Sequence, residues 1–144
     1  MKSFCCFILS LLCWPALLSA QSDLAIQEAF RKYGVRSDAT EVLIEGRRLK
    51  PYHLSRFHSL EIKSPPPACV KAIEEMVLTD TQHSLHSEGR LGQGANGSAF
   101  FEIPCRKHLH AYIFYRLSEQ KLALIYIEGQ ADLKELKLNF KKSK

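Results

Sequence analysis

Two apolar runs in the C-terminal third of the chain, HLHAYIFYRL (108–117) and KLALIYIEG (121–129), constrain the fold more than any other feature. Their β-branched and aromatic residues, and the short turn SEQK between them, are typical of a β-hairpin. Aligning Leu117 with Leu122 predicts matched pairs on both faces: Tyr115–Leu124 and Ile113–Tyr126 on one, Phe114–Ile125 and Tyr112–Ile127 on the other. Because both faces are apolar, we expect this hairpin to lie in the centre of a sheet rather than at its edge.

The remaining segments predict how the sheet is completed. Helices are expected at 22–34, 65–80 and 131–138, and further strands at 40–46, 58–64 and 98–104. The resulting order α-β-β-α-β-β-β-α predicts an α+β fold, with a mostly antiparallel five-stranded sheet and the helices packed on one face. The polar, glycine-rich segment 81–97 is expected to be a long loop or a disordered excursion.

The first twenty residues, MKSFCCFILSLLCWPALLSA, have the pattern of a secretory signal peptide. Lys2 gives a positive start, an apolar run follows, and the small residues Ser19 and Ala20 precede a cleavage site at Gln21. The apolar run is too short for a permanent transmembrane helix. We therefore expect an exported protein (periplasmic, cell-surface or secreted), with no transmembrane anchor after cleavage and with residues 21–144 forming one domain.

The distribution of charge argues against nucleic-acid binding. The chain has 20 basic and 15 acidic residues, and the basic residues are interleaved with acidic ones until the tail LKLNFKKSK. No basic stripe or binding motif is visible, so we expect no nucleic-acid partner. The densest basic stretch before the tail could dock an acidic partner or a lipid headgroup, although a solvated connection is the simpler interpretation. It consists of Arg47, Arg48, Lys50 and Arg56.

The segment GQGANG (92–97) matches the G-x-G-x-x-G pattern of dinucleotide-binding loops. That chemistry requires a strand before the glycines and a helix after them, so that helix N–H groups meet the pyrophosphate. Here the polar HSEGRL precedes the segment and the strand-like SAFFEI follows it. We therefore interpret the glycines as a flexible loop that leads into a strand. Asn96 also begins an N-x-S sequon, which matters only in a host that glycosylates exported proteins.

Removal of the signal peptide leaves two cysteines, Cys69 and Cys105. They could form a disulfide, or remain as buried or free thiols. A catalytic interpretation is also open, because Cys69 falls in the first turn of an expected helix, where the dipole favours a thiolate. His108 or His110 on the following sheet could then act as its base, as in cysteine hydrolases. No third residue stands out to orient the histidine.

Six histidines raise the question of a metal site: His53, His58, His83, His86, His108 and His110. His108 and His110 share one strand face, and His83 and His86 are spaced for one face of a helix. Sites with two histidines also need convergent carboxylate or cysteine ligands, and the sequence does not establish that convergence. We expect no metal and no other cofactor.

Three segments resemble small exported proteins of unknown function that are common in Bacteroidetes. They are the ending LALIYIEGQADLKEL, the stretch LIEGRRLKPYHLSRFHSLEI and the first helix, which ends in Lys32-Tyr33-Gly34. The resemblance implies an α+β fold and a periplasmic or surface location. It supplies no activity and no catalytic residues.

Three functional hypotheses follow. The preferred one is a non-enzymatic exported domain that binds an envelope or extracellular protein, because a good core and an export signal occur without a convincing set of catalytic residues. The alternative is a cysteine-dependent hydrolase that uses Cys69 with His108 or His110. A secreted small-ligand or inhibitor domain would require a cleft, which only a structure can reveal.

Overall fold

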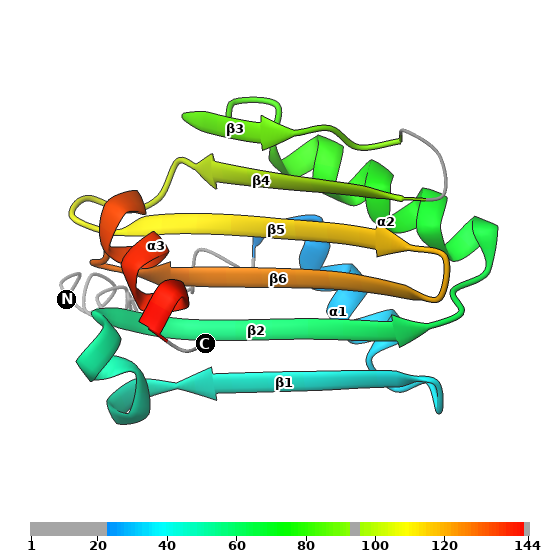
Figure 1. Cartoon of the computed structure of the whole chain (residues 1–144), viewed down its shortest axis with the longest axis horizontal. Coiled ribbons are helices and arrows are strands. Elements are labelled where there is room, and N and C mark those ends of the chain that lie inside the picture. The colour runs from blue at the N-terminus through cyan, green and yellow to red at the C-terminus, as the bar shows by residue number, and fades with distance from the viewer. Residues whose placement is uncertain (1–22, 93–95, 143–144) are drawn as a thin grey trace, which may run out of the picture.

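The computed structural model describes residues 23–92 and 96–142, and one antiparallel sheet organises them (Figure 1). The elements in chain order are α1 (Ile26–Tyr33), β1 (Ala39–Glu45), η2 (Gly46–Tyr52), β2 (Leu54–Lys63), α2 (Pro67–Asp80), β3 (His86–Gly89), β4 (Gly97–Ile103), β5 (His110–Ser118), β6 (Lys121–Gly129) and α3 (Leu133–Lys142). None of the helices in these residues is long and apolar enough to cross a membrane.

The strands of this region lie in the order β1-β2-β6-β5-β4-β3, and each neighbouring pair is antiparallel. β5 and β6 occupy the centre, as their two apolar faces predicted. Their register is also the predicted one: Leu117 pairs with Leu122, Tyr115 with Leu124, Ile113 with Tyr126, Phe114 with Ile125 and Tyr112 with Ile127. The α+β class, the antiparallel sheet and the central hairpin are therefore confirmed.

Two helices, α1 and α2, cover one side of the sheet, which we call the two-helix face (Figure 1). Each helix buries one stripe of side chains at helical spacing: Ile26, Ala29, Phe30 and Tyr33 in α1, and Cys69, Ile73 and Val77 in α2. The stripes pack on alternate strand residues, all of them buried: Leu60, Ile62, Ala111, Ile113, Tyr115, Leu122, Leu124 and Tyr126. This layer is the main core.

The end of α2 also fixes the beginning of α1. The carboxylate of Asp80 accepts the backbone N–H groups of Ala25 and Ile26 at 2.7 and 2.8 Å. These N–H groups lie at the helix terminus, where they have no partner within the helix itself. Asp80 therefore caps α1 from another element, and the two helices are joined as one layer.

The third α-helix, α3, packs on the opposite side, which we call the single-helix face (Figure 1). The expectation that all helices share one face is therefore wrong for α3. Tyr112 explains this placement, because its side chain is on the single-helix face and its hydroxyl donates to the carbonyl oxygen of Ala131 at 2.9 Å. That bond holds the chain on this side of the sheet just before α3 begins.

The segment 81–97 contains a strand where a loop was predicted. β3 pairs with β4, so the described sheet has six strands rather than five. All four β3 residues are exposed, so the strand carries no apolar alternation and is held by backbone pairing. Gly89 ends it at a φ of 76°, where a Cβ atom would also collide with the carbonyl of Ser98.

β1 and β3 form the two edges of this sheet. β3 has only four residues, whereas β1 has seven and most of them are exposed. Val42 and Leu43 of β1 are 39% and 51% exposed. Because successive side chains of a strand alternate, these two lie on opposite faces of the sheet.

Candidate functional site

The single-helix face is hollowed where α3 does not fill it. A cavity of about 270 Å³ lies beneath α3, and a second of about 540 Å³ continues over the sheet. The two share Glu88, Phe100 and Phe114, so together they form one depression, which we call the sheet-face groove. The first is also lined by Leu133, Leu136, Lys137 and Phe140, and the second by Gly89, Ser98, Ala99, Tyr115, Arg116, Ala123 and Ile125.

The groove exists because the helix above it is short. α3 has ten residues and is about 15 Å long. β5 and β6 have nine residues each, which span about 30 Å. One short helix therefore covers only part of a face whose apolar residues continue along both strands.

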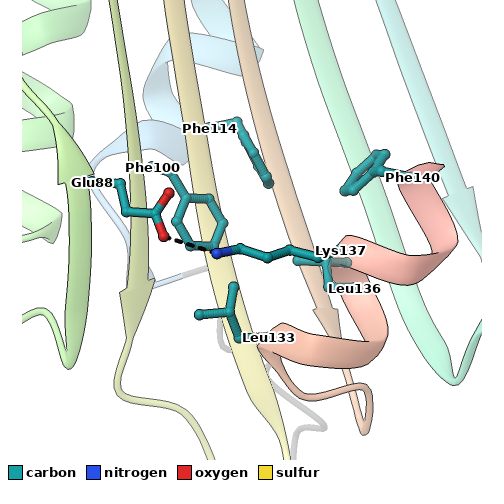
Figure 2. A pocket seen from close by; sticks show the side chains of 7 residues that line it. All are labelled: Glu88, Phe100, Phe114, Leu133, Leu136, Lys137 and Phe140. Atoms are coloured by element: carbon teal, nitrogen blue, oxygen red, sulfur yellow. Dashed lines mark hydrogen bonds and ion pairs between the residues drawn. The ribbon is translucent and has the colours of Figure 1, made fainter.

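Aromatic and aliphatic side chains make the floor of the groove. Phe100, Phe114 and Ile125 are cross-strand neighbours on β4, β5 and β6, so all three lie on the same face. The ring centroids of Phe100 and Phe114 are 4.5 Å apart, and Phe140 of α3 approaches Phe114 edge-on at 5.7 Å (Figure 2). Phe114 and Ile125 are half-buried and Phe140 is 43% exposed, so this apolar surface is open to contact.

A charged bridge crosses the groove between α3 and β3. Lys137 extends past Phe100, and its Nζ lies 3.0 Å from Oε1 of Glu88 (Figure 2). His86 Nε2 lies 2.9 Å from the same oxygen. The hydrogen bonds with His86 and Lys137 hold the pKa of Glu88 below its usual value. All three side chains are exposed, so the bridge is screened by solvent and can open at little cost.

The other end of the groove is polar. Arg116 follows Phe114 by two residues on β5 and so lies on the same face, and its cross-strand partner on β4 is Ser98. Both residues are exposed. Within the described part of the chain, the Arg116 side chain has no ion pair or hydrogen bond. The neighbouring acid, Glu61, is instead paired with Lys121 at 3.0 Å.

Surface contacts attach α3 to the rest of the molecule. Asp132 and Glu135 cap the helix reciprocally, with side chain to backbone bonds of 2.9 and 3.2 Å. Glu135 also lies 3.3 Å from Nδ1 of His53, and the side-chain amide of Asn139 donates to the carbonyl of Tyr52 at 3.2 Å. Leu136 is the buried residue of α3. α3 is therefore held less firmly than α1 and α2, which each bury a full stripe.

A model of a protein family of unknown function matches residues 13–140, which include every strand of the sheet and the whole groove. The chain belongs to this family, DUF6108. No curated protein matches this DUF6108 chain. Unknown function, one element of the resemblance seen in the sequence, is therefore confirmed. The bacterial source and the export that it also implied stay predictions, and the signal-peptide segment falls outside the described residues.

The two cysteines in the described part of this DUF6108 chain, Cys69 and Cys105, are free thiols. Cys69 is 5% exposed in the core of the two-helix face, near the beginning of α2. Cys105 follows the end of β4, and these two points lie at opposite ends of the sheet (Figure 1). Burial raises the pKa of both thiols. The geometry thus favours separate thiols over a disulfide or a reactive thiolate.

The histidines proposed as a base for Cys69 lie elsewhere. His110 stacks with Tyr112 on the single-helix face, and its Nδ1 is 2.9 Å from Oε1 of Glu102. Cys69 packs on the other face. His108 is exposed in the turn between β4 and β5, at the end of the sheet away from the beginning of α2 (Figure 1). The structure does not bring either histidine to the cysteine.

Histidines of this DUF6108 chain pair with single glutamates instead of gathering around a common point. The pairs are His53–Glu135, His58–Glu41, His86–Glu88 and His110–Glu102. His58 is buried and also stacks on Phe30 with ring centroids 3.6 Å apart. In residues 23–92 and 96–142, no cluster of three or more potential metal ligands occurs.

The basic stretch surrounds the junction of η2 and β2. Arg47, Arg48 and Lys50 are exposed on η2, where Leu49 is the buried anchor. Arg56 pairs with Glu45 of the neighbouring strand. None of these basic residues lines the sheet-face groove, and their role in partner binding stays a prediction.

The GQGANG segment joins two strands. Gly92 has a φ of 73° after β3, and Gly97 begins β4, where it pairs with Leu117. Residues 93–95 lie outside the described part of the chain. Because a strand follows the glycines, the segment lacks the helix N-terminus that a pyrophosphate requires.

Sequence reasoning did not predict the groove. It placed Phe114 and Ile125 on an apolar face of the hairpin, but not beside Phe100, Ser98 or Arg116, because the register between β4 and β5 was not predicted. A usable signal was present: the hairpin has two apolar faces, and a third helix too short to cover one of them follows directly.

Proposed function

We propose that this protein is a non-enzymatic, exported binding domain that holds the apolar part of a small amphipathic molecule in the sheet-face groove. The observation that carries the proposal is the hollow lined by Phe114, Ile125 and Phe140, whose apolar side chains stay partly exposed beside the buried Phe100. A hollow that is mostly apolar and carries a few polar groups at its borders is the usual form of a small-ligand site.

The form of the groove supports a small ligand. Its larger part, about 540 Å³, is in the range of small-molecule sites, and its smaller part, about 270 Å³, lies just below it; such sites are mostly apolar with a few placed polar groups. Here the polar groups are Glu88 and Lys137, which bridge the groove where its two parts meet, and Arg116 at the end away from α3. The groove supplies the cleft that the small-ligand hypothesis required. Export rests on the signal-peptide pattern of the first twenty residues.

Binding of a neutral apolar dye tests this proposal. Nile red should bind the purified protein with enhanced, blue-shifted emission, because the floor is apolar and open. Ala123→Trp should abolish most of that enhancement, since Ala123 is half-buried at the floor and a larger side chain fills the second cavity.

Leu43→Trp is the matched control, because Leu43 is an exposed residue of β1 outside the groove. It should leave dye binding unchanged. Equal emission from wild type and Ala123→Trp, with thermal melting showing both folded, would place the dye elsewhere and contradict the proposal.

Thiol titration distinguishes binding from cysteine-dependent hydrolysis. Burial raises the pKa of Cys69 and Cys105, so both should react slowly with a disulfide reagent at pH 8 in the native protein. Cys105 should react first, because it is the less buried of the two. Fast modification of Cys69 would restore the hydrolase hypothesis, and a mass showing a disulfide would contradict the free-thiol assignment.

A further inference from the structure

We propose that the ligand of the sheet-face groove is a single-chain fatty acid, with its carboxylate bound by Arg116 and Ser98 and its acyl chain extending over Phe114 toward α3. This inference rests on the proposed function and adds the chemical class and the orientation of the ligand.

The head-group site consists of two side chains whose placement follows from strand pairing. Ser98 and Arg116 are direct cross-strand partners on β4 and β5, so their Cβ atoms lie about 5 Å apart on one face. A guanidinium presents parallel N–H donors that match the two oxygens of a carboxylate. The Ser98 hydroxyl can donate a further hydrogen bond to the same group.

The charges around the groove favour an anion at this end. Glu61 is paired with Lys121 at 3.0 Å, and Glu88 is paired with Lys137 at the same distance. Arg116 is the lining cation left without such a partner among the described residues. A carboxylate placed there forms an ion pair with Arg116. A neutral head group forms none, and the guanidinium then stays without an ion-pair partner.

The apolar side chains of the groove extend from Arg116 toward α3. From Arg116 to Tyr112 along β5 is four residues, or about 14 Å, with Phe114 midway. Ala123 and Ile125 flank this path on β6, and Leu133 and Leu136 lie at its end beneath α3. An extended chain of medium length therefore lies mainly on apolar residues and crosses the exposed Glu88–Lys137 bridge, which can open, before its methyl end reaches the helix.

A comparison of decanoate with 1-decanol tests the inference, because the two differ in the charge of the head group. Calorimetry at pH 8 and low salt should give about threefold tighter binding of decanoate, as expected for one exposed ion pair. Arg116→Gln should remove this preference while 1-decanol binds as before. High salt should reduce the preference in the wild type.

Arg48→Gln is the matched control, because it removes one exposed positive charge outside the groove. It should retain the preference for decanoate. The inference is overturned if wild type binds both compounds equally, if Arg116→Gln keeps the preference, or if Lys137→Gln loses it instead, which would place the carboxylate under α3. If neither compound binds, the proposed function fails together with this inference; equal binding of both overturns only the head-group assignment.

Discussion

The two faces of this sheet are formed by the same strands, but their side chains are buried to different extents. On β6, Leu122, Leu124 and Tyr126 point to the two-helix face and are fully buried, while Ala123 and Ile125 on the single-helix face stay half-buried. The strand composition is apolar on both sides, but the covering helices supply a complete layer on only one. The comparison separates a fully buried layer from one that is buried only in part: the single-helix face buries Tyr112, Ile127 and Leu136 but leaves Phe114 and Ile125 partly exposed.

The largest expected difference between the faces is in the cost of truncating a buried residue. Ile73→Ala, in α2, should lower the free energy of unfolding by about 3 kcal/mol, because the rigid two-helix layer leaves a cavity. Leu136→Ala should cost only about 1 kcal/mol, because α3 can shift to close the gap. Urea denaturation measures both. Equal losses would show that α3 is as much a part of the core as α2.

An intermediate effect is expected from the caps of the helices. Asp80→Ala should cost about 1–2 kcal/mol, because it removes both bonds that join α2 to the first turn of α1. Asp132→Ala also removes a cap, but within α3, and should lower global stability less. A reversal of this order in thermal or urea unfolding would mean that α3, rather than the α1–α2 pair, limits unfolding.

The smallest effect concerns the Glu88–Lys137 bridge and depends on pH. Because its hydrogen bonds lower the pKa of Glu88 below the usual 4.5, the bridge contributes fully above pH 4.5 and is lost as the pH falls through the lowered value. The amide protection factors of α3, which correct for the intrinsic pH dependence of exchange, should therefore fall under acid while those of α2 stay unchanged. Glu88→Gln should already show lowered α3 protection factors at pH 6, relative to wild type at the same pH. Similar acid sensitivity in α2 would contradict local release.

The central hairpin could be predicted to the residue, because each of its faces carries apolar side chains that match in one register only. β3 could not be predicted in this way. HSEG has no apolar residue, and the strand forms because β4 offers an unpaired edge and Gly89 permits the positive φ at its end. Edge strands of this kind are determined by their neighbour rather than by their own sequence.

The candidate site was harder to predict than the fold because it depends on which face each residue takes. Side chains alternate along β5, so His110, Tyr112, Phe114 and Arg116 lie on one face of the sheet. Cys69 and the rest of α2 pack against the other face. The hypothesis that joined Cys69 to His110 required both to share a face. α3 could be predicted as a helix, but the side on which it packs is set by the Tyr112 hydroxyl, a contact invisible in a one-dimensional pattern.

The long edge strand β1 is expected to promote self-association of the protein at high concentration. β3 is too short to recruit another chain. Among the described residues β1 has a free outer edge seven residues long, where alternate residues leave their backbone N–H and C=O groups unpaired, and Val42 and Leu43 are exposed on either side. Copies of the chain at high concentration are expected to add to one another at β1 first. A lysine at position 42 would place a positive charge at the middle of that edge, and so lengthen the useful life of a concentrated sample.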